Sequence, residues 1–178
     1  MDQLVAHERA QQAFARVLAG VKPDQLDGPT PCPEWNVWAV IDHVVGGNWR
    51  VAGTEEPTPG SAEDLAAAHA ASALAAQSAF SADDGLTRTY HIRIGDVPGS
   101  AYVGLRTTDT LVHAWDIATA TGQPTDLDPE VAEAMLDMSR QRITDAFRGE
   151  GRPFGTEQEC GDDHSIADRL AAFLGRRP

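Results

Sequence analysis

Apolar residues recur at steps of three and four along most of this sequence, and runs rich in proline and glycine separate the stripes. In the first stripe these residues are Phe14, Val17, Leu18 and Val21. Side chains at this spacing share one face of an α-helix, and that face must be buried against another element. The pattern therefore predicts a mainly helical chain whose helices pack on one another.

The segment Gly28–Pro33 contains three prolines, which fix φ and restrict the residues before them, so it cannot be helical. Asn36 then has the position of an N-cap. The apolar residues after it keep helical spacing, and Gly46-Gly47 weakens this helix without ending it. These apolar residues are Val37, Val40, Ile41, Val44 and Val45.

A second break, over Thr54–Gly60, contains two prolines. Ser61 and Asp64 after it are spaced as a capping box, so an alanine-rich helix is predicted from there to Phe80. Its small side chains would let neighbouring helices approach closely.

Three more helices are predicted in the second half of the chain. The first covers Ser100–Thr121 and stops at Gly122, a natural residue for the end of a helix. Asp128-Pro129 has the sequence of an N-cap and first helical residue. Ser165 marks the start of a last short helix.

Alternating apolar and polar residues predict a short strand over Leu86–Ile94, followed by a turn at Gly95–Gly99. The loop-like segment Gly149–Gly161 includes a candidate second strand over residues 154–160. We expect a single domain: a bundle over about residues 1–122, then an additional helix and a C-terminal extension over about 123–178.

The charge balance excludes some partners. Lys plus Arg is 14 against 27 Asp plus Glu, a formal charge of −13 that argues against binding to nucleic acid or an anionic membrane surface. No stretch approaches the roughly 18 apolar residues of a membrane span, and no secretory signal is visible. Cys32 and Cys160 form no CxxC pair. We therefore expect a cytoplasmic protein with reduced thiols and a small-molecule ligand.

Asp109 and His113 are the strongest candidates for chemistry, because residues four apart project from one face of a helix and can bind one divalent ion. Asp116 is placed to orient His113 through a hydrogen bond or to act as a base, and a hydrogen bond that only holds helix ends together is the alternative. Spacing alone also allows an exposed acid–histidine pair. A third ligand must come from another helix, where His43 is a better candidate than His69 or His7.

The tryptophans and Cys32 are expected to have mainly structural roles. All four tryptophans, Trp35, Trp38, Trp49 and Trp115, are expected to be packing residues, and Trp49, within two turns of His43, is also a candidate to line the mouth of the bundle. Cys32 has no histidine beside it in the sequence, so we expect a small buried residue and not a nucleophile.

Two blocks of sequence resemble a known family. Pro31-Cys32-Pro33-Glu34-Trp35-Asn36-Val37 followed by His43, and His113-Ala114-Trp115-Asp116-Ile117-Ala118 followed by Thr121-Gly122, are similar to the mycothiol-dependent maleylpyruvate isomerase N-terminal family of the DinB/YfiT-like superfamily. Gly151–Gly155 and Asp168–Arg176 also resemble one uncharacterised branch of it.

The resemblance implies a four-helix bundle, here with an additional helix, a short β segment and a small C-terminal helix. It also implies a divalent metal bound by a histidine of the second helix and by an acid and a histidine of the fourth, which are His43, Asp109 and His113 by motif. Two departures matter: the isomerase has glutamate where this chain has Asp109, and it carries a further C-terminal domain. Maleylpyruvate isomerisation itself is therefore not expected.

Two histidines and one carboxylate would leave open coordination positions, which suits catalysis. Zn²⁺ is the leading candidate, with Ni²⁺, Fe²⁺ and Mn²⁺ left open. The resemblance implies that a thiol such as mycothiol binds as a thiolate and serves transfer to, or isomerisation of, a small electrophile. A hydrolase that activates water, a non-catalytic metal- or ligand-binding bundle and a dimeric scaffold with a vestigial site are the alternatives.

Overall fold

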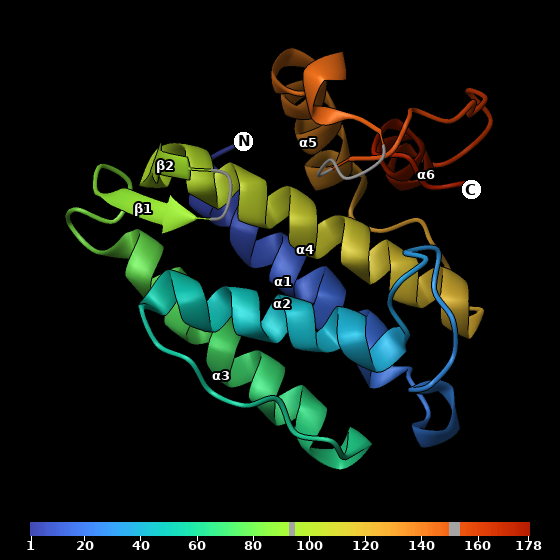
Figure 1. Cartoon of the computed structure of the whole chain (residues 1–178), viewed down its shortest axis with the longest axis horizontal. Coiled ribbons are helices and arrows are strands. Elements are labelled where there is room, and N and C mark those ends of the chain that lie inside the picture. Colours follow the sequence, from blue (N-terminus) through green and yellow to red (C-terminus); the bar gives the residue numbers. More distant parts are fainter. Residues whose placement is uncertain (93–94, 150–153) are drawn as a thin grey trace.

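The computed structural model describes residues 1–92, 95–149 and 154–178 (Figure 1). Four long helices lie side by side: α1 (Gln3–Ala19), α2 (Val37–Ala52), α3 (Ala62–Ser81) and α4 (Gly99–Thr121). Helix α1 packs against α3 and α4, and α2 packs against the same two helices. This arrangement confirms the predicted helical bundle.

The ends of the bundle helices follow local sequence signals. The Asp2 carboxylate accepts hydrogen bonds from the backbone N–H groups of Leu4 and Val5, so α1 begins well before the first apolar stripe. Asn36 caps α2 by accepting from the Ala39 N–H at 2.8 Å, as predicted. Helix α4 ends at Gly122, whose φ of 69° is the left-handed conformation that glycine adopts at little cost.

The β segment differs from the prediction. The strand predicted over Leu86–Ile94 begins later than expected, since β1 covers Thr89–Ile92. Residues 93–94 of the predicted strand lie outside the described part of the chain. The predicted turn at Gly95–Gly99 is wrong: β2 (Gly95–Pro98) pairs with β1 in antiparallel register, and Gly99 opens α4. Tyr90, opposite Val97, is buried against Phe80 and Tyr102, and this packing at the end of the bundle holds the hairpin.

Beyond the bundle, α5 (Pro129–Arg142) and α6 (Ile166–Phe173) lie near α4. The predicted caps are present: Asp128 accepts from the Val131 N–H, and Ser165 and Asp168 form a reciprocal capping box. The candidate strand over residues 154–160 is absent from the part of this segment that the structure describes, where only Phe154 forms an isolated bridge, with Arg148. Short 3₁₀ turns cover Pro23–Gln25 and Asp145–Phe147.

The main hydrophobic core fills the space between α1, α2 and α4 and continues to α5 and α6. Phe14, Ile41 and Trp115 are among its largest fully buried side chains. The Trp115 indole N–H donates to the Asp168 carboxylate at 2.7 Å, which ties the C-terminal helix to α4. Among the described residues, no helix has both the length and the apolar character needed to cross a membrane.

Candidate metal centre

The structure brings His43, Asp109 and His113 together. His43 lies on α2, and Asp109 and His113 lie one turn apart on α4. The Nε2 atom of His43 is 3.1 Å from both carboxylate oxygens of Asp109. The Nε2 atom of His113 is 3.5 Å from Asp109 Oδ1. One candidate ligand atom from each residue lies within 4.8 Å of the other two.

Helix packing explains this convergence. Val40, Ile41, Val44 and Val45 anchor one face of α2 in the core, which leaves His43 at the edge of that face toward α4. The side chains of His43 and Asp109 are 28% and 29% exposed to solvent, whereas that of His113 is 6% exposed. The trio therefore has a buried side and a side that opens to solvent.

Asp116, three residues after His113, contacts the imidazole ring of His113. His113 Nδ1 lies 2.9 Å from Asp116 Oδ2, and the Asp116 carboxylate is fully buried. The guanidinium of Arg176, near the C-terminus, donates to both Asp116 oxygens. When His113 donates its Nδ1–H to Asp116, the lone pair of Nε2 faces Asp109 and His43.

Arg106 is the second neighbour of the trio, and the sequence reasoning missed it. It donates from Nη1 to Asp109 Oδ2 at 2.6 Å and from Nη2 to the Val44 carbonyl at 3.1 Å. Its approach depends on Gly47, because a Cβ at that position would lie 2.4 Å from Arg106 Nη1. The helical spacing of Arg106 three residues before Asp109 was the only signal in the sequence.

Neighbouring charged groups shift the pKa values of Asp109 and His113. Burial raises the pKa of Asp109, but Arg106, His43 and His113 outweigh it and hold that pKa well below its usual value. Burial lowers the pKa of His113, but Asp109 and Asp116 outweigh it and raise the pKa above 6.5. An ion bound by the trio would therefore have to displace a proton from His113 in mildly acidic solution.

His7 and His69, the poorer candidates for a third ligand, belong to a different cluster. Gln11 contacts His7 Nε2 at 3.3 Å and His69 Nε2 at 2.9 Å inside the bundle. Gln11 also exchanges hydrogen bonds with Asn48, which accepts from Arg106. Burial lowers the pKa of each histidine to about 4, so both are neutral at pH 7.

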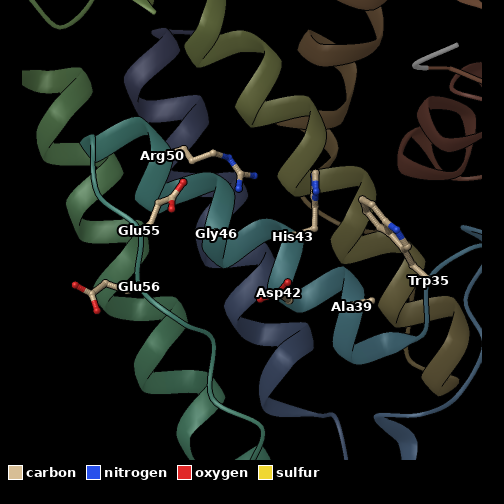
Figure 2. Close-up of a pocket in the computed structure, with 8 residues that line it drawn as sticks. All are labelled: Trp35, Ala39, Asp42, His43, Gly46, Arg50, Glu55 and Glu56. Carbon is tan, nitrogen blue, oxygen red and sulfur yellow. The ribbon is translucent and has the colours of Figure 1, made fainter. Parts of the chain in front are cut away.

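A pocket of about 460 Å³ opens beside His43, which is the member of the trio that lines it (Figure 2). His43 lies in its wall, and the indole of Trp35 packs 4.6 Å from the His43 ring and 5.4 Å from the His113 ring, measured between centroids. Trp35 was expected only to pack, yet it also lines this pocket. Trp49 packs on the main core, as expected of the tryptophans, and is not one of the residues that line this pocket. The remaining lining residues are Ala39, Asp42, Gly46, Arg50, Glu55 and Glu56.

The donor set fits a first-row divalent ion. Bonds of about 2.1 Å in a tetrahedral site separate neighbouring ligand atoms by about 3.4 Å. The contacts of 3.1 and 3.5 Å from Asp109 to the two imidazoles are close to that separation. Although aspartate is one methylene shorter than glutamate, Asp109 reaches both rings, and Arg106 holds its other oxygen.

Residues 7–118, which include the whole trio, match the family model described as the mycothiol maleylpyruvate isomerase N-terminal domain. The chain belongs to this family. An uncharacterized protein of Mycobacterium tuberculosis, found in strains H37Rv and CDC 1551, is 52% identical over 180 residues, covering 99% of this chain and 98% of the relative.

Two solved structures have the same fold. The mycothiol-dependent maleylpyruvate isomerase matches with a TM-score of 0.63 at 19% identity, covering 85% of this chain and 72% of the other. A histidine-to-alanine variant of that isomerase matches with a TM-score of 0.64 at 17% identity, covering 84% and 72%. At these identities the likeness establishes the helical fold.

Proposed function

We propose that this protein is a divalent-metal-dependent enzyme that uses a low-molecular-weight thiol of the mycothiol type for transfer to, or isomerisation of, a small electrophile. The observation that carries the proposal is the convergence of two imidazoles and one carboxylate beside an open pocket. Membership of a family named for a mycothiol-dependent isomerase supports the choice of thiol.

Each residue has a role in this proposal. His43, Asp109 and His113 hold the ion, for which Zn²⁺ is the first choice. A bound divalent ion supplies a positive charge that stabilises a thiolate at neutral pH. Asp116 holds His113 in the tautomer whose Nε2 faces the site. Trp35 covers the two imidazole rings, which keeps one side of them away from water.

The test is a conjugation assay with mycothiol and 1-chloro-2,4-dinitrobenzene, using protein loaded with Zn²⁺, Ni²⁺, Fe²⁺ or Mn²⁺. The proposal expects turnover that requires both metal and thiol, and that falls at least about a hundredfold in His113→Ala. Asp96→Asn, on the exposed hairpin, is the matched control and keeps full activity. Absence of metal-dependent turnover with this electrophile and with a panel of epoxides and enones would count against an enzyme.

One observation favours a second candidate, a non-catalytic ligand-binding bundle. Arg106 already pairs with Asp109 at 2.6 Å, so the carboxylate has a cationic partner without any metal. Under this alternative the protein binds a thiol or metal tightly without turnover, and ligand binding in His113→Ala equals that of the unmodified protein.

A further inference from the structure

The pocket beside the trio has an uneven distribution of charge. Three of its lining side chains are carboxylates, those of Asp42, Glu55 and Glu56, and one is a guanidinium, that of Arg50. In Figure 2, Glu55 and Glu56 lie at the end of the pocket away from Trp35. The lining therefore carries an excess of two negative charges at neutral pH, and two of its acids mark one end.

The segment that carries these two glutamates is fixed at both ends. The Thr54 N–H donates to the Trp49 carbonyl at 3.0 Å, directly after α2. The Trp38 indole N–H donates to the Pro59 carbonyl at 3.1 Å. Because both ends are attached to α2, the acids stay near the pocket, although their side chains are exposed.

Arg50 does not neutralise the negative charge of Glu55 and Glu56 at the end of the pocket away from Trp35. A Cβ on Gly46 would lie 3.4 Å from Arg50 Nη1, so the guanidinium folds back over the helix. Figure 2 shows the Arg50 side chain extending along α2 in the direction of His43. Among the ion pairs of the described side chains, none includes Arg50.

On the buried side of the site, two arginines neutralise two carboxylates, one of which belongs to the trio. Arg106 pairs with Asp109, and Arg176 pairs with Asp116. An ion held by the trio would add positive charge at this inner end, next to Arg50. Without an ion, the wall beside His43 holds both Asp42 and Arg50, whose charges offset each other, and the excess negative charge comes from Glu55 and Glu56. The lining as a whole is negative, so it disfavours an anionic ligand.

We propose that this pocket selects its thiol by charge, admitting a thiol whose tail is uncharged and hydroxyl-bearing or is cationic, and disfavouring one whose tail is anionic. The inference rests on the proposed function, which brings a thiolate to the inner end. Hydroxyl and ammonium groups donate hydrogen bonds that the carboxylates of Glu55 and Glu56 accept, whereas an anionic tail is repelled. The Trp35 ring offers an apolar surface to an uncharged tail and a π-face to a cation.

The charge claim is tested first without metal or thiol, by quenching Trp35 fluorescence. The Trp35 contribution is the difference between the unmodified protein and Trp35→Phe. At a constant ionic strength of about 0.1 M, charges act over about 10 Å. The quenching constant of each ion is divided by its value for free tryptophan. For Trp35 this ratio is expected to be at least threefold higher for caesium than for iodide. In Glu55→Gln/Glu56→Gln this preference falls at least twofold.

A matched variant on another surface controls for total charge. Glu133→Gln/Asp137→Asn removes the same two charges from exposed positions of α5, none of which lines the pocket, and is expected to leave the quenching ratio unchanged. Equal quenching by caesium and iodide, or the same change in both double variants, would overturn the proposal.

Thiol selection is then measured on Co²⁺-loaded protein under anaerobic conditions, using the absorption band that a thiolate gives on Co²⁺. The probes are 2-mercaptoethanol, thiocholine and 2-mercaptoethanesulfonate, which differ in tail charge. The sulfonate is expected to have a Kd at least threefold above that of 2-mercaptoethanol, and thiocholine a Kd no higher than that of 2-mercaptoethanol. Glu55→Gln/Glu56→Gln should reduce the sulfonate difference. Equal affinities of the three thiols would overturn the proposed selection by charge. Absence of the absorption band with every thiol would refute the proposed function. The quenching experiment would still decide whether the pocket is negatively charged.

Discussion

His113 Nδ1 lies 2.9 Å from the carboxylate of Asp116, a fully buried residue one turn further along α4. This contact links the candidate metal centre to the C-terminal segment, because Arg176 donates to the same carboxylate. The orientation of His113 thus depends on a residue that lies more than sixty positions away in the sequence.

Asp116→Asn is expected to lower Zn²⁺ affinity about 10- to 100-fold, because the neutral amide no longer makes His113 a better ligand. It should also lower the free energy of unfolding by about 3 kcal/mol, because Arg176 would remain buried without its carboxylate. Zn²⁺ affinity is measured by competition with a chelator, and stability by urea unfolding.

The exposed hairpin provides the control for this substitution. His91 and Asp96 form a similar histidine–carboxylate contact of 2.7 Å, but both side chains are largely exposed. Asp96→Asn should leave both quantities unchanged. Unaltered Zn²⁺ affinity in Asp116→Asn would show that this carboxylate only holds the C-terminal segment in place.

Gly47→Ala is expected to destabilise the protein by about 1–3 kcal/mol, because the new methyl group would overlap the buried Arg106 guanidinium. Gly46→Ala is the matched control, since its nearest atom is Arg50 Nη1 at 3.4 Å. In a helix interior this second change should be neutral or stabilising by up to about 1 kcal/mol. Urea unfolding of both variants measures the difference, and equal stabilities would show that Arg106 moves aside freely.

Stability should fall in acid because of His7 and His69. Their pKa values near 4 in the folded state lie below the ordinary 6.5, so the unfolded chain binds protons that the folded chain does not. Their contribution is complete above pH 6.5 and decreases as the pH falls toward 4. Between pH 8 and pH 5 the loss is up to about 2 kcal/mol for each histidine.

Variants isolate this effect from the titration of other groups. His69→Gln keeps a polar side chain beside Gln11 and should unfold with a smaller dependence on pH than the unmodified protein. The measurement is the free energy of unfolding in urea at pH 8, 7, 6 and 5. The same pH dependence in His69→Gln would mean that His69 is protonated inside the folded protein.

The sequence predicts most of the helices because their signals are local. Asn36, Gly122 and Ser165 act on backbone groups within a few residues, and the spacing of Asp109 and His113 on one helix is equally local. His43 was the best third ligand by its place beside the apolar face of its own helix, and the resemblance to known blocks of sequence pointed to the same residue. Spacing alone does not show which helices are neighbours, so the contact of His43 with Asp109 needed the structure.

The remaining features depend on tertiary contacts. The strand β2 exists because Tyr90 and Tyr102 bury the hairpin, while its own residues, Gly95–Pro98, read as a turn. Arg106 contacts α2 through the Val44 carbonyl and Asn48, which only helix packing brings near. The proline-rich turn before α2 places Trp35 against the two imidazole rings, and the course of this turn cannot be read from a simple sequence signal.

The most direct test of the central claim is the Zn²⁺ content of the purified protein after loading and dialysis. The unmodified chain is expected to retain one ion per molecule, and His43→Ala and His113→Ala to lose it. His91→Ala, exposed on the hairpin, should retain it. If the unmodified protein retains no ion, or if both site variants retain one, then His43, Asp109 and His113 do not form a metal centre.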